Sequence, residues 1–256
     1  PSTSRRRFLS ALVVTASATL LPASLVVAAA PRTLRVSRTH FPQSVASGDP
    51  RPDRVLLWTR VLADVASVRL QVAEDAAFAQ LRVDRLLPLE RDSDGCLKVR
   101  VDGLAAGTTY HYRFLLDVDR GVSSPVGRTR TAPTADADVP VRFAFLSCQD
   151  YGGRWYNTLL PLLEQDLDFV LHLGDFIYET AGDPQFQDRD GERGIVFDDI
   201  DGAIALERGG QRYHAARSLD NYRQLHRTYR TDTALQTLLE HAPLVAVWDD
   251  HEFSDD

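Results

Sequence analysis

The stretch FVLHLGDFIYE, residues 169–179, joins a buried strand to a reactive end. Its opening apolar run is typical of a strand inside a sheet. Gly174 and Asp175 follow, and Tyr178 comes three residues later. A glycine permits a sharp turn, so the strand is expected to end there with the carboxylate of Asp175 at its tip. Taken alone, Asp175 could also be an ordinary turn residue, and the neighbouring strands decide between the two interpretations.

Two further apolar runs, residues 141–147 and 244–248, are expected to form strands beside this one. Helical patterns lie between the three strands; they cover residues 155–165, where Pro161 weakens the pattern, 221–226 and 233–241. Apolar strands separated by helices indicate a parallel sheet with helices on both faces. We therefore expect residues 141–256 to form an α/β domain.

All three predicted strands end on side chains that can bind metal. Cys148 follows the first strand, Asp175 and Tyr178 follow the second, and Asp250 and His251 follow the third. The carboxyl ends of neighbouring parallel strands share one edge of a sheet, where ligands bind. A thiolate and a phenolate suit a trivalent or Lewis-acidic transition metal, and carboxylate oxygens suit a harder ion such as calcium. The pattern predicts a two-metal cleft that clamps a phosphate and activates a water.

Other interpretations exist for each of these residues. Cys148 could form a disulfide with Cys96, the only other cysteine. Tyr178 could be a packing residue and His251 a hydrogen-bonded core histidine. We expect His172, inside the strand, to be structural. The joint position of the candidates at three successive strand ends favours the metal site.

The charge balance bears on the partners of the chain. The formal net charge is −7 at pH 7, whereas a nucleic-acid binder normally has a basic face; we therefore expect no nucleic-acid binding. An anionic substrate would have to be attracted by bound cations. Residues 183–202 are rich in Asp, Glu and Gly; we expect a solvated insertion loop, with a lid over the cleft as the alternative.

The first half of the chain carries strand signals without long helical patterns. Apolar and polar residues alternate at 68–72, 99–101 and 110–114, which indicates strands with one buried face. Short strands at this spacing predict a β-sandwich of the immunoglobulin or fibronectin III type over residues 38–132. Residues 133–140 are small, polar and flanked by proline, which is typical of a linker between domains.

Residues 1–30 have the composition of a signal peptide. Ser4-Arg-Arg-Arg-Phe-Leu precedes an apolar stretch that ends in Ala28–Ala29–Ala30. The paired arginines resemble a twin-arginine signal, so we expect interaction with the twin-arginine export machinery and a periplasmic or secreted protein. A membrane anchor is the alternative, but Pro22 and the Thr and Ser residues dilute the hydrophobic run. Cleavage would leave no stable membrane anchor.

Several motifs together resemble the PhoD-type alkaline phosphatases. They are FPQSVASGDPRPDRVLLWTRV at 41–61, FAFLSCQDY at 143–151, HLGDFIYE at 172–179 and WDDHEFSDD at 248–256. In its core this family is similar to other calcineurin-like metallophosphoesterases and to purple acid phosphatases. The resemblance implies an N-terminal β-sandwich followed by a catalytic αββα sandwich. Family members continue for a second half with further ligands, so we expect residues 141–256 to be the first half of an incomplete catalytic domain.

The resemblance also implies an iron(III)–calcium site. Carried over onto matching positions, Cys148 and Tyr178 would ligate iron. Asp175 would bridge iron and calcium, and Asp255 would ligate calcium.

Asp250 and His251 would have a lesser role toward metal or substrate, and we expect them to be the catalytic side chains. The expected function is hydrolysis of phosphomonoesters and, in many members, phosphodiesters by attack of a metal-activated water. An inactive relative and a cell-surface binding module that uses the β-sandwich are the two alternatives.

Overall fold

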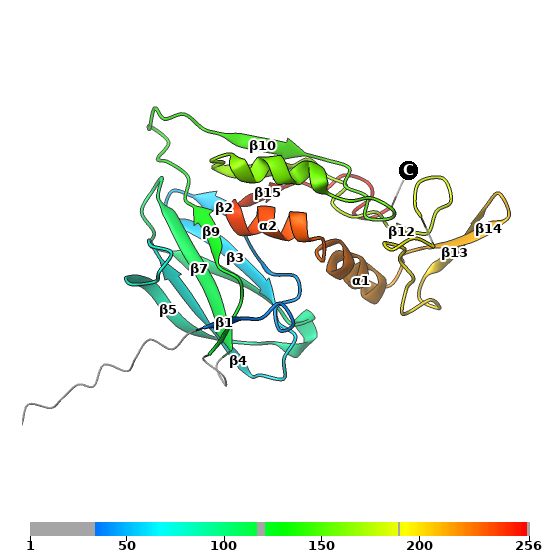
Figure 1. Ribbon diagram of the computed structural model, residues 1–256, viewed down its shortest axis with the longest axis horizontal. Helices are drawn as coiled ribbons and strands as arrows, with labels where there is room; N and C mark the ends of the chain where they lie inside the picture. The colour runs from blue at the N-terminus through cyan, green and yellow to red at the C-terminus, as the bar shows by residue number, and fades with distance from the viewer. Residues whose placement is uncertain (1–33, 117–120, 189, 255–256) are drawn as a thin grey trace, which may run out of the picture. The chain divides into compact units, whose positions relative to one another are not determined.

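A computed structural model describes residues 34–116, 121–188 and 190–254 of the chain (Figure 1). The expected signal peptide, residues 1–30, and the candidate ligand Asp255 lie outside these ranges. In the part of the chain that the structure describes, no helix has the length and apolar character needed to cross a membrane.

The N-terminal half is built from two β-sheets that face each other, as expected from its alternating patterns. The first sheet contains β1 (Arg35–Val36), β4 (Ser67–Ala73), β5 (Leu81–Pro88), β7 (Thr109–Leu116), β8 (Val122–Ser123) and β9 (Gly127–Arg130). The strands β2 (Val45–Arg51), β3 (Arg54–Arg60) and β6 (Cys96–Asp102) form the facing layer. Buried side chains alternate along β3 and β4. Leu57, Leu70 and Phe114 from the two layers share one core, which is the packing of a β-sandwich.

The second half contains three parallel strands in the order β10–β11–β15. They are β10 (Phe143–Leu146), β11 (Phe169–His172) and β15 (Leu244–Ala246). The expected parallel arrangement of three neighbouring strands is therefore confirmed. Their carboxyl ends lie at the same edge of the sheet, because Leu146 is in register with His172 and His172 with Ala246.

Two α-helices and one 3-10 helix accompany this sheet. The α-helices α1 (Leu219–Tyr229) and α2 (Thr233–His241) begin at Ser218 and Asp232, whose side chains accept hydrogen bonds from main-chain nitrogens of the first turn. The helix expected over residues 155–165 is instead the 3-10 helix η2 (Asn157–Glu164). Pro161 lies inside it and has no N–H to donate, which disfavours an α-helix there.

In the described part of the chain, helices cover only one face of the parallel sheet. The expectation of helices on both faces is therefore wrong for this part. Leu159 of η2 and Leu235 of α2 pack with Val170 of β11 in one core, whereas Phe145 is 69% and Trp248 84% exposed. The strand order explains this: chain connections between parallel strands are right-handed. Because β10, β11 and β15 succeed one another in the same direction, both connections lie on the same face.

The sandwich and the parallel strands share one six-stranded sheet. Strand β15 pairs in parallel with β2 at Leu244 and Gly48, which gives the order β10–β11–β15–β2–β3–β6. A Cβ atom at position 48 would lie 2.7 Å from the carbonyl oxygen of Leu244, so this close approach requires glycine.

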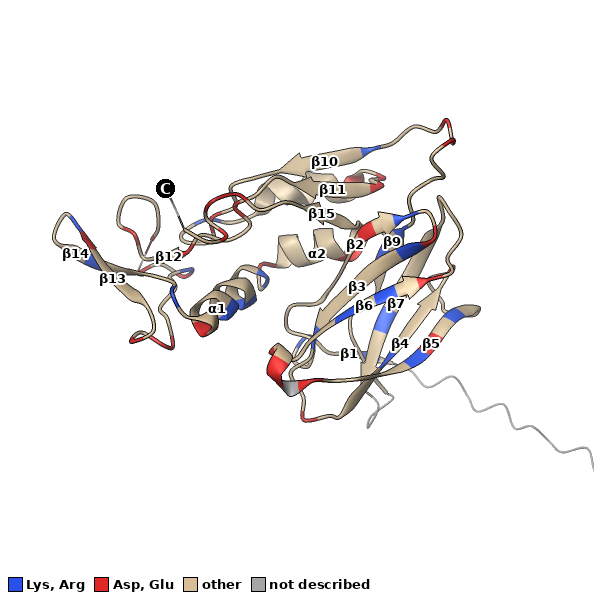
Figure 2. Cartoon of the chain, turned by 180° about the vertical axis from the view of Figure 1, so that it is seen from behind, with Lys and Arg blue, Asp and Glu red and all other residues tan. Residues whose placement is uncertain are grey.

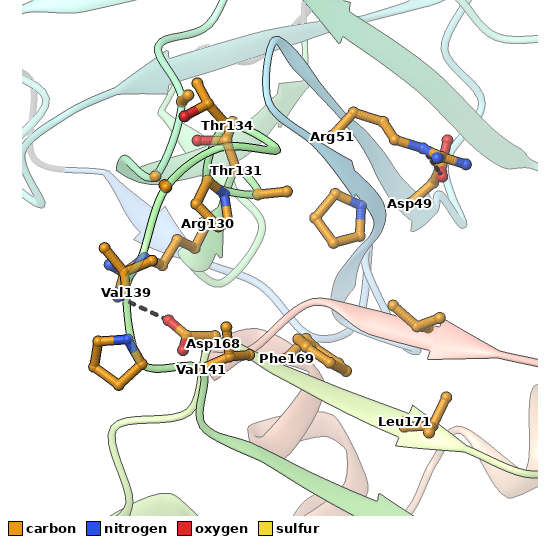
Figure 3. Close-up of a pocket in the computed structure, with 18 residues that line it drawn as sticks. Asp49, Arg51, Arg130, Thr131, Thr134, Val139, Val141, Asp168, Phe169 and Leu171 are labelled. Carbon is orange, nitrogen blue, oxygen red and sulfur yellow. Dashed lines mark hydrogen bonds and ion pairs between the residues drawn. The ribbon is translucent and has the colours of Figure 1, made fainter.

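Residues 133–140 connect β9 to β10 and pass a pocket of about 820 Å³ (Figure 3). Its walls come from the end of β2, the connecting residues and β11. At the same place Arg130 of β9 pairs with Asp168, directly before β11, at 2.8 Å. This ion pair links the sandwich to the start of the central parallel strand.

Residues 183–202 contain no helix or strand among the described positions, in agreement with the expected loop. They are flanked by a three-stranded antiparallel sheet that the sequence patterns did not predict. It consists of β12 (Thr180–Ala181), β13 (Ile204–Arg208) and β14 (Gln211–Ala215). Strands β13 and β14 form an antiparallel hairpin (Figure 1).

Candidate metal centre

The ends of β10 and β11 are joined by main-chain hydrogen bonds just beyond the strands. The nitrogen of Cys148 donates to the carbonyl of Gly174 at 3.2 Å, and that of Gln149 donates to the carbonyl of Asp175 at 3.0 Å. Cys148 and Asp175 both have φ of 56°, a left-handed conformation that is uncommon for side chains other than glycine and often occurs at functional sites. The two candidate ligands are thus turned out of their strands at matched positions.

Gly174 allows the end of the third strand to approach. Its φ is 111°, and a Cβ atom there would lie 2.5 Å from the Cβ atom of Asp249 and 2.7 Å from its nitrogen. Any side chain at position 174 would therefore push Asp249, and with it Asp250 and His251, away from the end of β11.

Three of the candidate ligands form a compact cluster. Asp175, Asp250 and His251 each offer one ligand atom, and these atoms lie within 4.8 Å of one another. Asp175 is buried, and its Oδ1 atom has no hydrogen-bond partner. A buried carboxylate oxygen without a partner is costly, and a bound cation would satisfy it. The carboxylates and the imidazole are common ligands of divalent and trivalent metals.

Tyr178 faces the same cluster. Its hydroxyl donates to Oδ2 of Asp175 at 3.3 Å, and its ring lies 4.2 Å from that of His251, centroid to centroid. Burial, followed by the charges of Asp175 and Cys148, raises the pKa of the Tyr178 hydroxyl above its usual value. The side chain is therefore a neutral phenol here, and a phenolate would need a strong positive charge beside it.

His251 is oriented by Glu179. The Nδ1 atom of His251 lies 2.7 Å from Oε2 of Glu179, which is buried. Burial lowers the pKa of His251, but the hydrogen bond and charge of Glu179 and the charges of Asp175 and Asp250 raise it overall. With Nδ1 engaged, Nε2 is the ring nitrogen left for a ligand or a substrate.

Both halves of the chain match known protein families. The model of the PhoD-like phosphatase N-terminal domain matches residues 27–133, and the model of the PhoD-like phosphatase matches residues 143–256. The chain belongs to the PhoD-like phosphatase family. Among curated proteins, alkaline phosphatase D of Bacillus subtilis (strain 168) is 32% identical over 226 residues.

A solved structure of PhoD is similar to the chain, with a TM-score of 0.70 and 31% sequence identity over 88% of this chain. The alignment with the Bacillus protein covers 83% of this chain. The chain spans 35% of the curated relative and 41% of the solved PhoD structure. Family membership thus rests on the part of these relatives that matches the sandwich and the three strand ends of this chain.

The structure of this PhoD-like chain places five of the six predicted site residues in one region; they are Cys148, Asp175, Tyr178, Asp250 and His251. Asp255 lies outside the described residues. Cys96 and Cys148 are both free, so the alternative of a disulfide between them is not realised. His172 is fully buried, and its Nδ1 atom accepts a hydrogen bond from the nitrogen of Gly174.

Glu252 is a site residue that the sequence patterns did not single out. Its carboxylate accepts hydrogen bonds from the main-chain nitrogens of Asp175 at 3.0 Å, Phe176 at 2.5 Å and Asp249 at 2.8 Å. One side chain therefore ties the end of β11 to the end of β15. In the sequence it is one acid among several in DDHEFSDD, and only the fold distinguishes it from its neighbours.

Proposed function

We propose that this chain is the N-terminal part of a metal-dependent phosphatase of the PhoD type. Its substrates would be phosphomonoesters, with phosphodiesters as a second class, and the reaction would be attack by a metal-activated water. The observation that carries the proposal is the meeting of Asp175, Asp250 and His251 beside Tyr178 at the ends of parallel strands.

The described residues around Asp175 fit a bound cation, and the resemblance to the family extends this proposal to a pair of ions. Cys148 and Tyr178 would hold iron(III), Asp175 would bridge, and Asp255 would hold calcium. The unpartnered Oδ1 atom of buried Asp175 supports the bridging role. When bound, the two ions supply Lewis acidity toward the phosphoryl oxygens and lower the pKa of a water molecule.

The protein contributes positioning and proton handling. Glu252 fixes the main chain at Asp175 and at Asp249. Glu179 holds Nδ1 of His251, so that Nε2 can donate a proton to the leaving oxygen of the ester. Asp250 lies beside His251 and supports its protonated form. Because the net charge of the chain is −7, the ions and not the protein surface would attract the anionic substrate.

We also propose export by the twin-arginine machinery to the periplasm or the medium, on the basis of Arg5 and Arg6 and the small residues at 28–30. Replacement of both arginines by lysine should retain the uncleaved chain inside the cell. Mass spectrometry of the exported protein would locate the cleavage site, and unaltered export of the double variant would refute this route.

Turnover of a chromogenic phosphomonoester by the iron- and calcium-loaded chain tests the enzymatic proposal. We expect hydrolysis that depends on both ions, that Asp175→Ala abolishes and that Asp53→Ala leaves unchanged, because Asp53 is an exposed residue of the sandwich. Hydrolysis that survives Asp175→Ala would contradict the site. Metal binding without turnover would favour the inactive relative, and the absence of both metal binding and turnover would favour the binding module.

A further inference from the structure

A second pocket, of about 280 Å³, lies between the sandwich and helix α1. Its lining includes Trp58, Arg60, Asp94, Arg223, Arg227 and Arg230. None of the clustered candidate ligands Asp175, Asp250 and His251 is among them. The pocket is therefore separate from the candidate metal centre, although both use residues brought together by the shared sheet.

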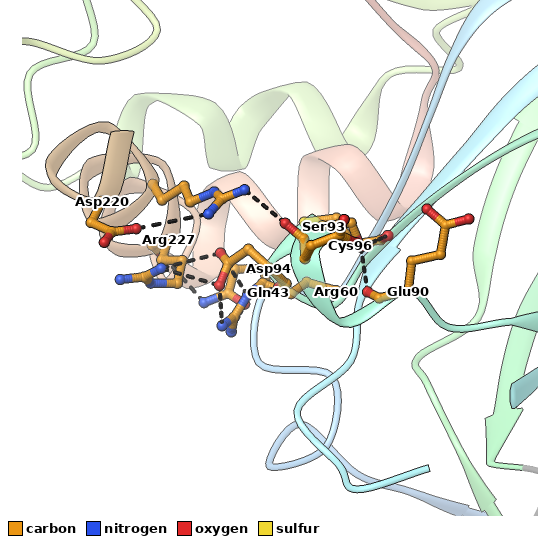
Figure 4. Close-up of polar contacts among 10 residues, drawn as sticks. Gln43, Arg60, Glu90, Ser93, Asp94, Cys96, Asp220 and Arg227 are labelled. Atoms are coloured by element: carbon orange, nitrogen blue, oxygen red, sulfur yellow. Dashed lines mark hydrogen bonds and ion pairs between the residues drawn. The ribbon is translucent and has the colours of Figure 1, made fainter. Parts of the chain in front are cut away.

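The lining is strongly basic, with four arginines against one aspartate. Helix α1 supplies two of these arginines, and the ribbon of α1 carries blue positions in Figure 2. Asp94 cannot balance them, because its carboxylate is shared by Arg60 and Arg227, each at 3.1 Å (Figure 4). The Nη2 atom of Arg223 donates to the carbonyl of Asp92 at 2.9 Å, and its Nη1 atom lies 3.7 Å from the carboxylate of Asp220, an exposed acid outside the lining. Four arginines thus face two acids. A net positive charge therefore remains around the pocket.

Arg230 is the cation in this pocket that lacks an acidic partner. Its guanidinium lies 4.7 Å from the ring centroid of Trp58 and 4.9 Å from that of Phe176. Its Nη1 atom is buried and has no hydrogen-bond partner, and no ion pair with Arg230 occurs among the described residues. A buried charge without a counter-charge is unfavourable. The two rings hold the guanidinium in place, so that a ligand would meet a pre-formed donor.

We propose that this pocket binds a phosphate-class oxyanion, with the guanidinium of Arg230 as the principal donor. Guanidinium groups offer paired N–H donors that match two oxygens of a phosphate. The surplus charge of the lining stabilises the anion, and the volume admits one phosphate group. This inference does not depend on the proposed phosphatase activity.

Calorimetric titration of the metal-stripped chain with inorganic phosphate tests the proposal. The titration uses the Asp175→Asn variant, which removes any phosphate binding by the candidate metal centre. We expect one phosphate per chain in this background, and binding about tenfold or more weaker for Arg230→Gln, since a charge-assisted hydrogen bond is lost. Arg85→Gln is the matched control, because Arg85 is an exposed arginine on β5 outside the pocket. Phosphate binding that is absent in the Asp175→Asn background, or unchanged in Arg230→Gln, would overturn the proposal.

A measurement without any change at Arg230 covers the case in which Arg230→Gln does not fold. Phosphate added to the metal-stripped chain should shift the NMR signals of the Arg230 side-chain N–H groups and of the Trp58 indole N–H in a saturable manner. Signals of Arg85 should stay in place. Unshifted Arg230 and Trp58 signals at saturating phosphate would overturn the proposal in the same way.

Discussion

Glu252 accepts a hydrogen bond at 3.0 Å from the main-chain nitrogen of Asp175, a residue 77 positions earlier in the chain. The same carboxylate also accepts from the nitrogens of Phe176 and Asp249. The candidate metal centre therefore depends on a side chain that need not touch a metal. Residues that position metal ligands commonly change metal affinity by tenfold to a hundredfold.

Removal of this carboxylate should weaken both the fold and the metal site. In Glu252→Ala three main-chain donors lose their acceptor, and we expect a loss of about 1–3 kcal/mol in the free energy of unfolding and metal binding about tenfold to a hundredfold weaker. Urea denaturation and calorimetric metal titration measure the two effects. Glu207→Ala, on exposed β13, is the control and should change neither. Metal affinity that is equal in both variants would show that Glu252 does not position the ligands.

The Gly174→Ala variant tests how closely the ends of β11 and β15 must approach. The added Cβ atom would meet Asp249 at 2.5 Å in a backbone with φ of 111°. Gly103→Ala is a matched control, because Gly103 has φ of 77° and nothing within 4 Å of an added Cβ atom. The control should lose about 1–2 kcal/mol from backbone strain alone. Gly174→Ala should lose more stability and should also bind metal more weakly. Equal losses of stability in the two variants, with intact metal binding, would contradict the close contact between the ends of β11 and β15.

Asp94 gives the fold an acid-sensitive contact. Partial burial raises the pKa of its carboxyl, but the hydrogen bonds and charges of Arg60 and Arg227 outweigh burial and lower the pKa below the usual value. A carboxyl whose pKa is lowered by folding stabilises the folded state at pH values above its pKa in the unfolded chain, about 3.9. This contribution is lost as the pH falls through the pKa of the folded state.

Asp94→Asn should therefore be less stable than the natural chain at neutral pH, and the difference should shrink below about pH 4. Asparagine tolerates the left-handed conformation of position 94, where φ is 55°, so strain is not added. Asp102→Asn, in an exposed pair with Arg100, should cost at most about 1 kcal/mol. Urea denaturation at several pH values measures both. A difference that grows as the pH falls would have the wrong sign for this contact.

A buried ion pair anchors the 183–202 loop to helix α2. Nη1 of Arg193 lies 2.7 Å from Oδ2 of Asp232, with both side chains almost fully buried, and the guanidinium lies 3.7 Å from the ring centroid of Tyr151. Arg193→Met leaves Asp232 as an uncompensated buried charge, so we expect a loss of about 3–5 kcal/mol and faster proteolysis of the loop. Arg51→Met breaks an exposed pair with Asp49 and should cost about 0–1 kcal/mol. Similar losses in the two variants would mean that burial of the Arg193 pair has no energetic consequence.

The site could be predicted from sequence where each residue has a fixed place relative to a strand end. An apolar strand followed by Gly174 and Asp175 specifies both the turn and its carboxylate, and the parallel register of β10, β11 and β15 brings the three ends together. The role of Glu252 depends on contacts between segments far apart in the chain, which no local pattern encodes.

The sequence patterns do not predict two features of the fold. The β13–β14 hairpin turns at Gly209 and Gly210, both with positive φ, and such a glycine pair between two short runs is a hairpin signal that the mostly exposed, polar strands obscured. The junction of β15 with β2 depends on the absence of a side chain at Gly48. Glycines occur in many turns and strands. The sequence alone therefore does not show which of these glycines lies against a neighbouring strand.

The most direct test of the metal centre is a crystal structure of the iron- and calcium-loaded protein with anomalous scattering recorded at the iron edge. We predict an iron peak in contact with the Sγ atom of Cys148, the carboxylate of Asp175 and the hydroxyl oxygen of Tyr178, and its loss in Asp175→Asn. An iron peak away from these three side chains, or one that persists unchanged in Asp175→Asn, would contradict the account.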